Sequence, residues 1–182
     1  MLETKRLILR PWSAEDAESL YKYAKNPEVG PAAGWPPHTS VEESQKIIES
    51  VLSDEGTFAV VLKETMEPAG SAGLKFGNKS SLAIDVDEAE IGYWIAQDYW
   101  GRGLIPEAVE ELLRYGFEDL GLKRIWCGYF EGNQKSARVQ EKCGFRYHHT
   151  EKDKPWPLIH AVITEHFSCI SETEWRKRAK PL

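Results

Sequence analysis

The sequence predicts a single mixed α/β domain, in which helices flank a mostly antiparallel sheet with one central parallel pair of strands. Strand-like and helix-like segments alternate along the whole chain of 182 residues, and no linker is long enough to divide it. One helical segment, residues 101–121, separates two apolar strand-like runs, and such a connection places its two strands parallel. We therefore expect residues 1–182 to form one domain.

Composition and charge are those of an ordinary globular protein. Hydrophobic residues make up 41% and charged residues 29% of the chain, which argues against disorder. The 23 Lys and Arg against 29 Asp and Glu give a net charge of −6, which disfavours nucleic acid and anionic membranes as partners. No segment reaches the ~18 apolar residues of a membrane helix, and the N-terminus lacks the apolar core of a signal peptide. With 3 Cys and no CxxC pair, free thiols and a cytoplasmic location are expected.

The first half of the chain predicts a strand, two helices and a hairpin. Ser13 and Asp16 have the spacing of a capping box, and Ser40 with Glu43 repeats it before an apolar helical face. A Gly- and Pro-rich loop separates the two helices. The predicted elements are a strand over 6–12, helices over 13–27 and 41–53, and hairpin strands over 57–62 and 69–77.

The second half predicts strands that alternate with helices before a closing strand pair. The helix over 101–121 is the most regular, because Pro106 suits a first turn, apolar residues follow at helical spacing, and Gly121 suits the C-terminal cap. The other predicted elements are strands over 89–97, 123–130, 145–151 and 158–170, a short helix over 133–144 and a solvated helix over 171–180.

Two glycines, Gly101 and Gly103, stand where a strand is followed by a helix. Glycine allows close backbone approach, and the free N–H groups at a helix start bind phosphate. A dinucleotide-binding G-x-G-x-x-G motif requires glycine where Pro106 stands, and a Walker loop requires a Lys followed by Ser or Thr that the segment lacks. The pair alone is equally compatible with an ordinary turn.

Three motifs together resemble the GNAT superfamily of N-acetyltransferases: AEIGYWI at 89–95, YWGRGLIPEA at 99–108 and NQKSARVQEKCGF at 133–145. The chain looks most like the branch typified by ribosomal-protein alanine acetyltransferases, from its LETKRLILRPW opening to its final TEW. The resemblance implies that acetyl-CoA lies in a splayed opening between the two parallel strands. It further implies direct attack by a primary amine in a ternary complex, without an acyl-enzyme and without metal.

The resemblance also implies residue roles in binding the cosubstrate. Asn133 would bond the pantetheine arm, and Ser136 would lie near the sulfur and donate a proton to the leaving thiolate. Alternatively, Asn133 caps the helix that follows it and Ser136 occupies its first turn. Asp98 replaces the usual Gln or Arg of the phosphate loop and is expected to face away. The implied acetyl-CoA contacts are Ile95, Ala96, Gln97, Trp100, Gly101, Arg102, Gly103, Leu104, Asn133 and Ser136.

Acetyl transfer requires a neutral amine, so a base or water chain must accept its proton, given amine pKa values of ~8 to ~10.4. Glu90, at the start of the AEIGYWI strand, is the first candidate for this base, directly or through water, and His160 is the second. The alternative for Glu90 and for His160 is a surface or structural role. The resemblance assigns the backbone N–H of Ile95 to the developing oxyanion.

The sequence defines the amine that accepts the acetyl group less well than it defines the acetyl donor. Trp35 and Tyr93 are expected to shape the acceptor pocket, with Trp156 on its other wall, although core packing is the alternative for any aromatic residue. The acceptor is expected to be a protein N-terminus or a small-molecule amine, because one scaffold serves many substrates. A homodimer is an expectation from the resemblance.

Two rival functions compete with catalysis of acetyl transfer. The first is a hydrolase, because AGSAG around Ser71 nearly matches a nucleophile elbow, but a strand and not a helix is predicted after the serine. The second is a noncatalytic acyl-CoA-binding sensor or interaction module with the same fold.

Overall fold

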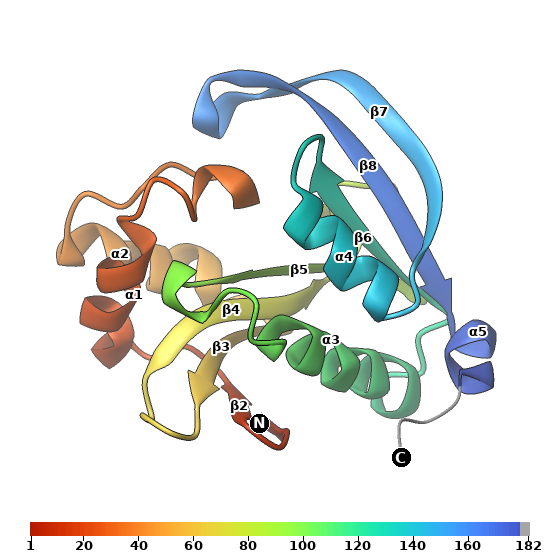
Figure 1. Ribbon diagram of the computed structural model, residues 1–182, viewed down its shortest axis with the longest axis horizontal. Helices are drawn as coiled ribbons and strands as arrows, with labels where there is room; N and C mark the ends of the chain where they lie inside the picture. The colour runs from red at the N-terminus through yellow and green to blue at the C-terminus, as the bar shows by residue number, and fades with distance from the viewer. Residues whose placement is uncertain (179–182) are drawn as a thin grey trace.

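The computed structural model describes residues 1–178, whose eight strands form one sheet in the order β1-β2-β3-β4-β5-β6-β8-β7 (Figure 1). This confirms the predicted mixed sheet, since β5 and β6 are parallel and the other neighbours antiparallel. The strands are β1 Leu2–Glu3, β2 Leu7–Arg10, β3 Thr57–Leu62, β4 Pro68–Lys75, β5 Glu88–Ile95, β6 Arg124–Phe130, β7 Arg146–Trp156 and β8 Ala161–Ser171.

Both predicted N-terminal helix starts are present. Ser13 and Asp16 form a reciprocal capping box, and the Ser40 hydroxyl accepts a hydrogen bond from the Glu43 N–H at 3.1 Å. No helix within residues 1–178 has the length and apolar character needed to cross a bilayer. The α-helices are α1 Ala17–Ala24, α2 Val41–Ile47, α3 Leu104–Arg114, α4 Gln134–Lys142 and α5 Glu172–Lys177.

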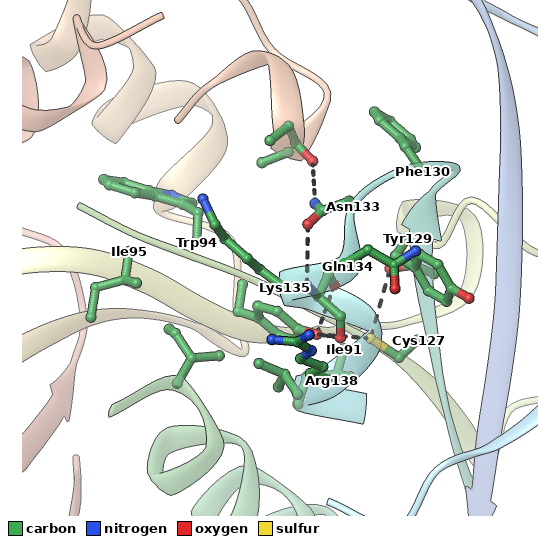
Figure 2. Close-up of a pocket in the computed structure, with 18 of the residues that line it drawn as sticks. Ile91, Trp94, Ile95, Cys127, Tyr129, Phe130, Asn133, Gln134, Lys135 and Arg138 are labelled. Atoms are coloured by element: carbon green, nitrogen blue, oxygen red, sulfur yellow. Dashed lines mark hydrogen bonds between the residues drawn. The ribbon is translucent and has the colours of Figure 1, made fainter. Parts of the chain in front are cut away.

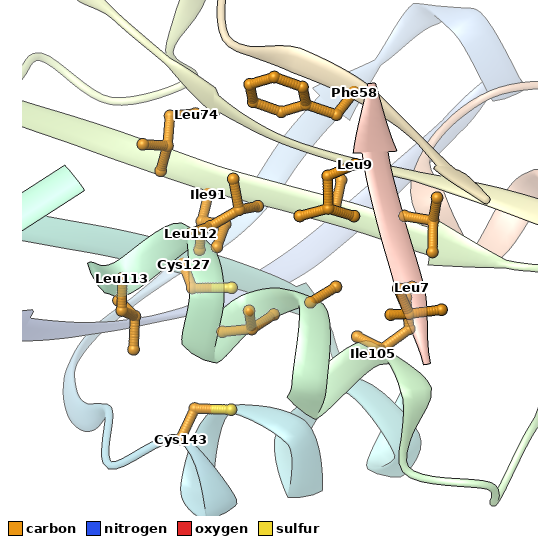
Figure 3. Close-up of a cluster of buried hydrophobic side chains, with 14 of the residues drawn as sticks. Leu7, Leu9, Phe58, Leu74, Ile91, Ile105, Leu112, Leu113, Cys127 and Cys143 are labelled. Carbon is orange, nitrogen blue, oxygen red and sulfur yellow. The ribbon is translucent and has the colours of Figure 1, made fainter. Parts of the chain in front are cut away.

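Strand β3 shows how the sheet divides two apolar clusters. Phe58 and Val60 face a large cluster under α3, while Ala59 and Val61 face a second cluster under α1 and α2. This follows from the alternation of side chains along a strand. Figure 3 shows the large cluster, where side chains of α3 lie over β2, β4 and β5.

The parallel pair separates before either strand ends. Strands β5 and β6 are in register from Glu88↔Arg124 to Ile91↔Cys127, although β5 continues to Ile95 and β6 to Phe130. The ends of the two strands therefore diverge, and α3 connects them on the face of the large cluster. This is the splayed pair that the resemblance implies.

Three predictions about single elements were wrong. Helix α3 begins at Leu104 and not at residue 101, because Gly101 and Gly103 adopt left-handed φ angles of 76° and 72°. Strand β7 continues to Trp156 and not only to residue 151, and β8 begins at Ala161 and not at residue 158, because residues 154–156 pair with 161–163. The last helix is not wholly solvated, because the ring of Trp175 packs 5.4 Å from that of Phe117; predicted positions 179 and 180 lie outside the described residues.

Candidate functional site

A cavity of about 750 Å³ opens where β5 and β6 separate (Figure 2). Its walls come from these two strands, the start of α3, helix α4, the β7–β8 hairpin and the segment after α1. Elements far apart in the sequence thus meet around one gap in the sheet. The predicted site residues that line it are Glu90, Tyr93, Ile95, Trp100, Gly101, Gly103, Leu104, Asn133 and Ser136.

Two predicted contacts that follow β5, Ala96 and Gln97, do not line the cavity. Ala96 is buried in the large cluster, and its N–H donates to the Ala69 carbonyl at 2.8 Å. The Gln97 amide oxygen accepts a hydrogen bond from Asn26 at 2.7 Å in a separate hollow, which Asp98 also lines. Asp98 is exposed, outside the cavity lining, in the orientation that the sequence predicts.

Arg102 and Trp35 are also absent from the cavity lining. The Arg102 guanidinium lies over the Tyr99 ring, 5.1 Å from its centroid. Trp35 packs edge-on against Trp94, with ring centroids 5.4 Å apart, and thereby supports a lining residue from behind.

His160, the second candidate base, lies at the tip of the β7–β8 hairpin in a left-handed conformation. Its side chain is exposed and does not line the cavity. This position follows from the unpredicted length of the hairpin, which carries the residue away from the separated strands.

Arg6, just before β2, secures the glycine loop at the start of α3. Its guanidinium donates to the Arg102 carbonyl at 2.9 Å and the Gly103 carbonyl at 3.2 Å, and it pairs with Glu107 at 2.7 Å. These contacts hold the two carbonyls on the Arg6 side of the loop. The first-turn N–H groups of α3 have no intrahelical acceptor, so this end of the cavity favours an anion.

Three cationic residues of α4, Lys135, Arg138 and Lys142, line the same end of the cavity. Lys135 Nζ lies 3.3 Å from the ring centroid of Trp100, whose indole N–H donates to the Ile95 carbonyl at 2.9 Å. Sequence reasoning missed these cations. Their spacing of three and then four residues, which places them on one helix face, was the available signal.

Asn133 fulfils the capping role and also bridges two parts of the cavity wall. Its side-chain oxygen accepts from the Ser136 N–H at 3.1 Å, and its side-chain nitrogen donates to the Ala32 carbonyl at 3.3 Å (Figure 2). The capping alternative is therefore correct, and the residue still lines the cavity.

Tyr93 is a partner of Ser136. The two hydroxyl oxygens lie 2.9 Å apart, and the Cys127 thiol lies 3.9 Å from the phenol oxygen. Burial raises the pKa of Tyr93 and also that of Cys127, so both remain protonated near neutral pH. The cavity thus holds a protonated hydroxyl pair, which the sequence did not predict because its members lie 43 positions apart.

The backbone of β5 faces the gap at alternate residues. Because the Ala96 N–H donates toward β4, strand alternation turns the N–H of the preceding residue, Ile95, toward the opening between β5 and β6. This is the donor position that the sequence prediction requires.

Two buried carboxylates line the cavity, and their partners differ. Glu90 is 5% exposed, and both of its oxygens accept hydrogen bonds from Ser80 and Ser81, including the Ser81 N–H at 2.6 Å. Glu165, on β8, is also 5% exposed and accepts from Lys154 at 2.8 Å. Desolvation raises the pKa of Glu165 above its usual value despite this cation.

Trp156 forms part of the wall that the sequence assigns to it. Its indole N–H donates to the Gly34 carbonyl at 2.7 Å, and its ring lies 5.0 Å from that of Phe130. The β7–β8 hairpin thereby contacts the segment between α1 and α2, toward which it arches in Figure 1.

Ser71 is not arranged as a hydrolase nucleophile. It lies inside β4, donates to the Phe58 carbonyl at 3.0 Å and accepts from the Trp12 indole at 3.2 Å, and no helix follows it. Within residues 1–178, no three His, Cys, Asp or Glu side chains form a group able to hold a metal ion.

Comparisons with known proteins agree with this geometry. The family model for an acetyltransferase (GNAT) domain matches residues 6–146. An uncharacterised N-acetyltransferase, p20 from Bacillus licheniformis, is 34% identical over 150 residues, which cover 80% of this chain and 82% of p20.

Two solved structures share the fold. An acetyltransferase of the GNAT family from Bacillus anthracis superposes with a TM-score of 0.82 at 23% identity, covering 94% of this chain and 98% of that one. The ribosomal-protein-S5-alanine acetyltransferase of Vibrio fischeri superposes with a TM-score of 0.74 at 20% identity, covering 99% of this chain and 98% of that one.

Proposed function

Because the chain belongs to the GNAT acetyltransferase family, we propose that its cavity binds acetyl-CoA and a primary amine together and catalyses direct N-acetylation. The observation that carries this proposal is the gap between β5 and β6, with an anion-favouring loop at one end and the Tyr93–Ser136 pair beside it. Acetyl-CoA supplies the acetyl group, activated as a thioester.

The residues present fit acetyl-CoA. The glycine loop and the first turn of α3 offer N–H groups to the pyrophosphate, and the cations of α4 offer positive charge to the phosphates. Asn133 lines the cavity, which supports its proposed bond to the pantetheine arm. Arg6 positions the loop without lining the cavity.

The chemistry needs a donor for the developing oxyanion and a proton for the leaving sulfur. The Ile95 N–H, turned toward the gap, stabilises the negative charge on the carbonyl oxygen. Ser136, bonded to Tyr93, delivers the proton to the thiolate. Glu90 lines the cavity as a buried carboxylate, and its role as the base stays a prediction.

We propose a protein N-terminus as the acceptor class and a small-molecule amine as the competing one. Resemblance to ribosomal-protein alanine acetyltransferases supports the first, and the buried carboxylates Glu90 and Glu165 favour a cationic amine of either kind. A homodimer and a cytoplasmic location stay predictions.

The test combines calorimetric binding of acetyl-CoA with a thiol-release assay. An alanine-initiated peptide, spermidine and an aminoglycoside serve as acceptors. Binding with turnover of the peptide supports the proposal in full, and turnover of another amine assigns a small-molecule acceptor. Binding without turnover of any acceptor favours a noncatalytic acyl-CoA sensor, and no binding contradicts the assignment of the cavity.

Replacing Arg6 with alanine should weaken acetyl-CoA binding by about 10-fold or more, because charge-assisted bonds to the loop carbonyls are lost. Binding of acetyl-pantetheine, which lacks the pyrophosphate, should not change. Arg114→Ala is the matched control, because Arg114 forms ion pairs with Glu111 and Asp119 at the other end of α3. If the substitution weakened the binding of acetyl-CoA and acetyl-pantetheine equally, Arg6 would have only a general structural role.

A further inference from the structure

The carboxylate of Glu165 lies over the point where the parallel strands part. Glu165 is paired with Phe130 at the end of β6, and its side chain reaches back along that strand. A Cβ built on Gly128 would lie 2.6 Å from Glu165 Oε1. Gly128 directly follows Cys127, the last residue of β6 in register with β5. The absence of a side chain at Gly128 therefore leaves room for the carboxylate at the opening.

The two oxygens of Glu165 differ in their contacts. Lys154 Nζ donates to Oε2 at 2.8 Å. No residue in the described range 1–178 donates a hydrogen bond to Oε1, the oxygen above Gly128. Glu90, in contrast, has bonds from serine groups on both oxygens. Of the two buried carboxylates, Glu165 has the oxygen that is free to receive a proton.

We propose that Glu165 is the general base that accepts the proton from the attacking amine, an inference that rests on the proposed acetyl transfer. Lys154 holds Oε2, so Oε1 is the atom that takes the proton. Glu90 contributes negative charge on the opposite strand of the gap and thereby helps to attract the ammonium form of the acceptor.

The electrostatic surroundings suit this role. Desolvation raises the pKa of Glu165, as do the nearby charges of Glu90 on β5 and Glu151 on β7, while Lys154 on β7 lowers it. Lys75 on β4 also lines the cavity and approaches Gly92. A carboxylate with a raised pKa is a stronger base than an exposed one.

The step balances in atoms and charge. The amine lone pair forms the new C–N bond to the thioester carbonyl carbon, and an N–H proton passes to Glu165 Oε1. The C–S bond breaks with its electron pair on sulfur. The thiolate then takes the proton of Ser136, which Tyr93 and solvent replace, and Glu165 returns its proton to solvent after product release.

The test compares Glu165→Gln with Glu151→Gln, using an alanine-initiated peptide as acceptor. Glu151 also pairs with Lys154, at 2.9 Å, but does not line the cavity. Glu165→Gln should lower kcat by about 10²-fold or more with unchanged acetyl-CoA affinity, and Glu165→Asp should retain part of the activity. Glu151→Gln keeps the carboxylate of Glu165 and its bond from Lys154, so its kcat should fall by no more than about threefold, and melting curves check that each variant is folded.

The pH profile separates a base from a structural residue. At low pH, log(kcat/KM) should rise with a slope of about 2 in the wild type, because the amine and Glu165 must both lose a proton, and about 1 in Glu165→Gln. A wild-type slope in Glu165→Gln, or a kcat no lower than in Glu151→Gln, would overturn the inference. A wild type that fails to bind acetyl-CoA or to release thiol would contradict the proposed function itself.

Discussion

Ser136→Ala and Tyr93→Phe should each lower kcat for acetyl transfer by about 10²-fold, with little change in acetyl-CoA affinity. The two hydroxyl oxygens lie 2.9 Å apart at the cavity wall, so they act as one proton donor. Because either substitution breaks the same donor, the double variant should lose little more than the poorer single variant. Steady-state kinetics on the four proteins, with calorimetric binding of acetyl-CoA, measure this non-additivity.

Tyr147→Phe provides the matched control for loss of a phenol. Tyr147 lies on β7, is exposed, and hydrogen-bonds Thr150 outside the cavity. Its substitution should leave kcat within about threefold of wild type, as is usual for surface changes. Additive losses in the double variant, or full activity in Ser136→Ala, would assign the protonation of sulfur to water and not to this pair.

Leu112→Ala should destabilise the protein by about 2–5 kcal/mol, the usual range for removing a buried leucine. Leu112 is 0% exposed and packs on the sheet from the last turn of α3 (Figure 3). At about 2–4 °C per kcal/mol for a chain of this size, the melting temperature should fall by about 4–20 °C. Differential scanning calorimetry measures the change.

Leu120→Ala is the control for this loss of stability. Leu120 is 42% exposed, beyond the end of α3, so its substitution should shift the melting temperature by no more than about 2 °C. Saturating acetyl-CoA should still stabilise Leu112→Ala, because the ligand site lies at the other end of the helix. Equal melting temperatures for the two variants would mean that the core under α3 repacks without a cavity.

Helix α3 explains why stability and function depend on one element. Its apolar face anchors the helix to the sheet, while its first turn, after Gly101 and Gly103, forms the anion-favouring end of the cavity. The same helix is the connection that makes β5 and β6 parallel. The splayed pair and the loop that serves it are thus parts of one β-α-β unit.

The sequence alone determined the fold class, the parallel pair, the two N-terminal helix starts and the glycine loop. Each of these depends on local patterns, such as the capping spacings at Ser13 and Ser40, the apolar period of residues 101–121 and the left-handed preference of glycine. The combination of motifs along the chain also indicated the GNAT family, which the family match over residues 6–146 confirmed.

Only the tertiary structure decided which side chains meet at the opening. Arg6 reaches a loop 96 positions away, and Tyr93 meets Ser136 across 43 positions. Glu165 comes to lie over Gly128 because β8 pairs with β6, a register that no local pattern specifies. The tertiary structure also placed four predicted site residues outside the cavity lining: Ala96, Gln97, Arg102 and Trp35. Local patterns report the conformation of neighbouring residues, whereas a site formed between strands depends on long-range pairing, and that pairing is set by the packing of the whole sheet.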